Sequence, residues 1–195
     1  MVEAAVALGI VVTAVSSALT LVTVSVKAEK ESELGIVAAN LAREGIEAVR
    51  AMRDSNWLAD QVFDSGIADP ARCTAIPVFD PSGQTSGFWS LDYATTGFGD
   101  LSSTVWRYTS SPNDATLGLY VQAPNKPPDT EATVFKRYLT ISSVCADASG
   151  NETTTCGPCA ATSHKIGMKV EVSVRWNVVN KQRNLKLEEW LYDWR

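Results

Sequence analysis

The run from Ala4 to Val26 constrains the fold of this chain most strongly, because it contains no charged residue. It is roughly 23 residues long, and a helix of that length spans the ~30 Å hydrocarbon core of a bilayer. One acid, Glu3, stands directly in front of the run, and Lys27 follows directly behind it. We therefore predict that residues 1–26 form an apolar helix, buried either in a membrane or among other helices.

Residues 27–55 are predicted to continue the same helix with a different surface. Small and apolar residues recur there at spacings of three and four, which places them in one stripe along the helix. The stripe consists of Leu34, Val37, Ala38, Leu41, Ala42, Gly45, Ala48, Val49 and Met52. No proline interrupts the chain before Pro70. The pattern predicts one helix from about Val2 to about Ser55, of which only the amphipathic half packs on a folded domain.

Residues 56–195 are predicted to form a β-rich head domain. Turn-forming and acidic residues dominate up to residue 87, so a loop is expected there. The expected strands, of which the last could instead be a short helix, are Phe88–Thr95, Thr104–Ser110, Leu117–Gln122, Val134–Val144, Lys169–Val178 and Leu185–Arg195. Residues 169–178 alternate strictly between apolar and polar, which is typical of an antiparallel sheet with one buried face. The predicted fold class is α+β, with one long N-terminal helix packed on an antiparallel sheet.

The four cysteines, Cys73, Cys145, Cys156 and Cys159, allow three kinds of chemistry. Cys156-Gly-Pro-Cys159 is spelled like a thioredoxin redox site, but we expect neither the strand before it nor the helix after it that this chemistry needs. Zinc binding is disfavoured because Cys73 and Cys145 lack a CxxC partner. Two disulfides are the favoured interpretation, as in exported proteins. Cys145 would bond to Cys156 or to Cys159, and the spacing leaves that choice open.

Other candidate sites are weak. His164 is the only histidine, so a catalytic triad centred on it lacks support elsewhere in the chain. Asp147, Ser149, Asn151 and Glu152 offer oxygen atoms to calcium but lack the full EF-hand spacing, so a polar turn is the better interpretation. Asn151-Glu152-Thr153 has the form of a glycosylation sequon. We expect no enzymatic activity, no cofactor and no metal.

The charge balance argues against a nucleic-acid partner as the default. The net charge is −5, which does not favour DNA or an anionic lipid surface. A local basic face in the last third of the chain stays open as an alternative. Its candidate members are Lys165, Lys169, Arg175, Lys181, Arg183 and Lys186.

The opening MVEAAVALGIVVTAVSSALTLV and the later AANLAREGIEAVRAMRDSNWL together resemble the type IV pilin family, pseudopilins included. In that family a peptidase removes a short leader at the inner membrane, and the new N-terminal residue is methylated. The resemblance implies that Met1 lies near the mature N-terminus and that Glu3 is the carboxylate that pairs with the N-terminal amine of a neighbouring subunit. Gly9 is a candidate flexible point in the apolar half.

The resemblance implies a structural subunit of a cell-surface filament. Such a subunit is anchored in the inner membrane before assembly and is processed by a prepilin peptidase. With an assembly machinery it then forms a helical homo-oligomer through its N-terminal helix. Two alternatives stay open at this point. One is a minor pilin or a secretion pseudopilin, and the other is a membrane-anchored extracytoplasmic binding domain that never polymerises.

Overall fold

The computed structural model describes residues 2–69, 71–79, 89–95, 97–110, 117–178 and 181–194. Its first element is one continuous helix, α1 (Val2–Leu58), which extends slightly beyond the predicted end at Ser55. Glu3 lies in the first turn of α1, where its negative charge suits the positive end of the helix dipole. The chain divides into two compact units, Met1–Val37 and Ala38–Arg195.

The second unit contains an antiparallel sheet whose central strand is β5. The strands are β1 (Thr74–Phe79), β2 (Trp89–Asp92), β3 (Thr104–Tyr108), β4 (Tyr120–Val121), β5 (Thr130–Asp147), β6 (Glu152–Thr155), β7 (Ser163–Val178) and β8 (Lys181–Tyr192), and a short 3-10 helix, η1 (Leu101–Ser103), precedes β3. β7 pairs with β5, and β8 pairs with β7. Different stretches of β5 pair with β1, β3 and β6.

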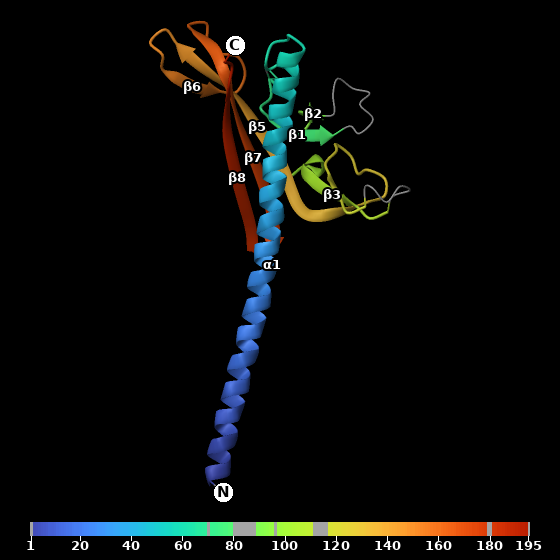
Figure 1. The fold of residues 1–195 in the computed structure, drawn as a ribbon, viewed down its shortest axis with the longest axis vertical. Coiled ribbons are helices and arrows are strands. Elements are labelled where there is room, and N and C mark those ends of the chain that lie inside the picture. The colour runs from blue at the N-terminus through green and yellow to red at the C-terminus, as the bar shows by residue number, and fades with distance from the viewer. Residues whose placement is uncertain are drawn as a thin grey trace. The chain divides into compact units, whose positions relative to one another are not determined.

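The C-terminal half of α1 packs along this sheet, and Figure 1 shows it running beside β5, β7 and β8. The buried residues of this half are Ala38, Leu41, Ala42, Gly45, Ile46, Ala48, Val49 and Trp57. The alternating residues Val170, Val172 and Val174 of β7 are fully buried as well. α1 and β7 approach closely at Gly45, where an added Cβ would lie 3.1 Å from Val172 Cγ1. The predicted α+β class, with the amphipathic half of one helix on an antiparallel sheet, is confirmed.

Two short strands were missed by the sequence prediction. β1 lies inside the segment that was expected to be a loop. Pro77 argues against a strand there, but pairing with β2 and β5 stabilises one. β6 directly precedes Cys156, so the expectation that no strand stands before the CGPC motif is wrong. β6 is polar throughout, and its pairing with β5 creates a strand that hydrophobic periodicity does not signal.

The remaining strands agree with the expected positions but differ in their bounds. β5 and β7 extend well beyond the predicted Val134–Val144 and Lys169–Val178. The last segment is a strand, β8, and it begins earlier than expected, at Lys181. The predicted strand ends at Phe88 and Arg195 lie outside the described residues.

Candidate functional site

The apolar half of α1 is exposed over its whole circumference. Its large aliphatic side chains are between 53% exposed, at Val15, and 79% exposed, at Val2. The most apolar stretch of the helix is 0% buried. By length and composition the helix is able to cross a membrane, and a signal sequence has the same properties. A surface of this kind is stable only in lipid or against other apolar surfaces.

The hydroxyl groups within this apolar half hydrogen-bond to the helix itself. Thr13 Oγ1 donates to Ile10 O at 2.9 Å, and Ser16, Ser17, Thr20 and Thr23 likewise donate to backbone carbonyls three or four residues earlier. These groups therefore need no water, which suits a segment surrounded by hydrocarbon or by packed helices.

Glu3 and Gly9 occupy this segment, whereas Met1 lies outside the described residues. Within the described part of the chain, no hydrogen bond or ion pair joins the Glu3 side chain to another residue. No atom lies within 4 Å of the position that a Cβ on Gly9 would occupy. The structure thus places both predicted assembly residues on an open helix surface, and it does not bring them together.

Charged residues begin immediately after the apolar half. Lys30 Nζ lies 3.0 Å from Glu33 Oε2, and both side chains are well exposed. This change from apolar to charged surface is the kind that a helix shows where it leaves a bilayer or an apolar bundle.

The two disulfides lie in the head. Cys145 bonds to Cys159, and Cys73 bonds to Cys156. Of the two pairings that the spacing left open for Cys145, the structure has the one with Cys159. The two cysteines of the CGPC motif are therefore bonded to different partners and not to each other, unlike the dithiol pair of a thioredoxin-type site.

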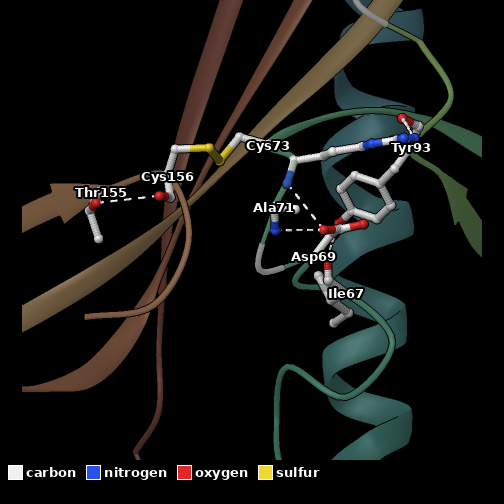
Figure 2. Close-up of a disulfide and its surroundings, with 8 residues drawn as sticks. Ile67, Asp69, Ala71, Cys73, Tyr93, Thr155 and Cys156 are labelled. Carbon is white, nitrogen blue, oxygen red and sulfur yellow. Dashed lines mark hydrogen bonds between the residues drawn. A yellow bond between two sulfur atoms is a disulfide. The ribbon is translucent and has the colours of Figure 1, made fainter. Parts of the chain in front are cut away.

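Each disulfide connects separate parts of the head. The Cys73–Cys156 bond joins the chain just before β1 to the loop after β6, and Figure 2 shows it together with the turn that positions Cys73. In that turn the Asp69 carboxylate accepts hydrogen bonds from the backbone N–H groups of Ala71 and Arg72. The Tyr93 hydroxyl donates to Ile67 O. The segment after α1 is thus held by covalent and polar contacts in addition to the buried side chains of Phe63 and Ile67.

A cavity of about 320 Å³ lies beside the Cys145–Cys159 disulfide. Its charged lining residues are Asp64, Asp69 and Lys165, and Lys165 forms an ion pair with Asp64. Among the described residues, no group of three or more His, Cys, Asp or Glu side chains is arranged to hold a metal ion. Lys165 offsets the charge of Asp64, and the Asp69 carboxylate accepts hydrogen bonds from the backbone N–H groups of Ala71 and Arg72, so both carboxylates already have partners within the chain.

The predicted polar turn at Asp147 is present as a hydrogen-bonded loop. Asp147 Oδ1 accepts from the N–H groups of Ser149 and Asn151, and Oδ2 accepts from Asn151 Nδ2. The side-chain hydrogen bond from Asn151 is the main cause that lowers the pKa of Asp147 below its ordinary value. The Asp147 carboxylate is thus engaged by the turn itself. His164 is exposed.

Several residues of the candidate basic face are neutralised by acids. Lys169 Nζ lies 2.7 Å from Glu188 Oε2, and Lys186 Nζ lies 2.7 Å from Glu171 Oε1. Lys165 pairs with Asp64 in a different region. Arg175 lies over the ring of Phe98 at 3.9 Å from its centroid. This region is therefore a surface of mixed charge.

A buried polar network was missed at the sequence level. Arg137 is 2% exposed, and its Nη1 donates to Leu41 O of α1 at 2.8 Å. Its Nε donates at 2.9 Å to Oε1 of Gln122, which is also buried. Glu44 lies 3.6 Å from Arg137 Nη1. The sequence does indicate that Arg137 is buried, because residues 135, 137 and 139 lie on one face of a strand and Phe135 and Leu139 are apolar. Alternation along a strand does not predict which polar groups come within hydrogen-bond distance of the guanidinium.

Searches against family models, curated proteins and solved structures find no match to this chain. The apolar N-terminal helix indicates a membrane anchor or a signal sequence, and the two disulfides indicate a location outside the cytoplasm.

Proposed function

We propose that this chain is a structural subunit of a type IV pilus-like extracellular filament that polymerises through the apolar half of α1. One observation carries the proposal: a helix apolar on every side bears a single carboxylate, Glu3, at its start and continues into a disulfide-bonded head. The helix dipole alone would also accommodate a carboxylate there, so the proposal rests on Glu3 together with the apolar helix and the head.

The apolar half of α1 must be kept away from water. Each large aliphatic side chain gains about 1.5–3 kcal/mol when it is buried, and lipid and a bundle of identical helices provide that burial about equally well. Exchanging one for the other therefore costs little hydrophobic free energy. Gly9 and the alanines near it leave room for close approach between helix backbones, which favours a bundle.

Glu3 determines where along the bundle a subunit is able to enter. An unpaired carboxylate in an apolar bundle carries a penalty of several kcal/mol, so a subunit enters the bundle favourably only where a positive group meets Glu3. The pilin resemblance implies that this group is the N-terminal amine of a neighbouring subunit. Pairing at one position along the helix also sets the axial register between subunits.

The test compares Glu3→Ala with Glu29→Ala, a matched loss of one exposed acid just beyond the apolar half. We expect Glu3→Ala to be inserted in the membrane with both disulfides formed but to yield no filaments after shearing. Glu29→Ala is expected to assemble like the wild type. The measurements are electron microscopy of sheared material, mass spectrometry of its N-terminal residue, and non-reducing gels of the membrane fraction.

Wild-type amounts of filament from Glu3→Ala would refute the assembly role of this carboxylate. If wild-type cells release no filaments containing the chain while it stays in the membrane, the anchored binding domain becomes the better interpretation. A chain found only in trace amounts within filaments of another subunit would indicate a minor pilin.

A further inference from the structure

β8 is a long strand at the edge of the sheet. It pairs with β7 over twelve consecutive residues, from Val178↔Lys181 to Gly167↔Tyr192, without a shift in register. Within the described part of the chain, no strand pairs with its other edge. The backbone N–H and C=O groups on that edge therefore form a regular row that a further strand is able to join.

The usual structural protections of an edge are absent from β8. Natural edge strands are commonly blocked by a proline, a bulge or a very short length. β8 contains no proline or glycine, and the irregularity next to it lies between β5 and β7, at Val144/Cys145. Charged side chains are the remaining protection, so their arrangement decides which strand is accepted.

The middle of β8 carries two opposite charges around one exposed leucine. The side chains of Lys186 and Glu188 are 56% and 54% exposed and lie on the same face of the sheet, because they are two residues apart in one strand. Leu187, between them on the other face, is 37% exposed. If a second copy of β8 runs antiparallel to the first, the lysine of each strand lies opposite the glutamate of the other.

We propose that β8 pairs antiparallel with β8 of a second copy of this chain, with Leu187 opposite Leu187 of that copy. In this register Lys186 lies opposite Glu188 of the second copy, and Glu188 lies opposite its Lys186. The contact is two-fold symmetric, so both ion pairs form together, and the two leucines cover each other.

Neighbouring registers are disfavoured by like charges. A shift by two residues in one direction places Lys186 opposite Lys186 of the second copy. A shift by two residues in the other direction places Glu188 opposite Glu188 of the second copy. Parallel pairing in register opposes every charge to its own copy. Like charges directly opposite each other destabilise a strand pair, so the proposed register is the favoured one.

The ion pairs within one copy are compatible with this contact. Lys186 already contacts Glu171, and Glu188 already contacts Lys169, both on β7. The cross-copy pairs extend these contacts into a row of alternating charges across four strands. Nothing in the proposal depends on filament formation, since it concerns the head alone.

The test uses two single charge reversals in the full chain, purified in detergent micelles. Lys186→Glu gives two acids at the contact, and Glu188→Lys gives two bases. Each variant alone is expected to dimerise at least about tenfold more weakly than the wild type, because each dimer contains the changed pair twice. An equimolar mixture of the two variants restores both ion pairs and is expected to restore the dimer.

Sedimentation velocity measures the dimer, and Arg107→Glu on β3 serves as a charge reversal away from β8. Intact disulfides and an unchanged circular dichroism spectrum check that the variants fold. A monomeric wild type, unchanged dimerisation of either variant, or a mixture that stays monomeric would each overturn the proposal. Glu3→Ala is expected to dimerise normally in this assay, which separates this contact from the filament proposal.

Discussion

The buried amide of Gln122 is predicted to matter more for stability than the buried charge beside it. Gln122 Nε2 donates to Ser102 O at 3.1 Å and to Arg137 O at 2.7 Å, while its Oε1 accepts from Arg137 Nε. It therefore connects η1, the end of β4 and β5, and through Arg137 it reaches Leu41 O of α1. Burial lowers the pKa of Arg137, and the nearby carboxylate of Glu44 opposes that shift.

Gln122→Leu keeps a similar volume and removes all three hydrogen bonds. It leaves two backbone carbonyls without their amide donor and leaves the buried guanidinium without its acceptor at Nε. The loss of one partner of a buried charge costs about 3–5 kcal/mol. We expect the free energy of unfolding to fall by about that amount.

Arg137→Met removes the charge itself and keeps an unbranched apolar chain in its place. Gln122 retains both of its donor bonds, because they go to backbone carbonyls, whereas Gln122 Oε1 and Leu41 O each lose a hydrogen bond from Arg137. Leu41 O lies in the middle of α1, where the helix supplies a backbone donor, so Oε1 is the acceptor left without one, at a cost of about 1–3 kcal/mol. The single change at Arg137 is therefore expected to be the milder of the two.

The double variant tests the reasoning most directly. Once the guanidinium is gone, Gln122→Leu no longer strands a buried charge, so the double variant is expected to lose at least about 1 kcal/mol less than the sum of the single losses. Urea unfolding of the full chain in detergent, followed by tryptophan fluorescence, measures all four proteins. Additive losses, or a larger loss from Arg137→Met than from Gln122→Leu, would show that the amide is not the centre of this network.

Two further predictions concern covalent and steric constraints. Removing the disulfide at Cys156, with both partners changed to Ser, is expected to cost about 4.5 kcal/mol, against about 3 kcal/mol for the one at Cys159, because the first closes a separation of 83 residues and the second only 14. Equal shifts in the urea midpoint would contradict this order. Gly45→Val is expected to cost about 1–3 kcal/mol through overpacking against Val172, whereas Gly35→Val, with no atom near its Cβ position, should stay within about 0.5 kcal/mol of the wild type. Similar midpoints for the two glycine variants would show that the helix–sheet contact yields without cost.

The amino-acid sequence alone determined the elements whose signals are local. The absence of charge from Ala4 to Val26 predicts an apolar helix, since every residue in that run contributes to the same signal. The stripe through Ala38, Leu41 and Gly45 predicts which side of the helix is buried, and strict alternation predicts the inner face of β7. In each case the periodicity of the helix or strand determines which residues lie on the same face, so their spacing in the sequence predicts the buried face.

Tertiary structure decided everything that depends on pairing between distant segments. Whether Cys145 bonds to Cys156 or to Cys159 depends on how the loop after β6 folds back, and the spacing permits both. β6 exists because its backbone pairs with β5, although its residues carry no apolar signal. Arg137 is stable inside the core because Gln122 and the Leu41 carbonyl come within hydrogen-bond distance, and no local pattern reports such long-range proximity.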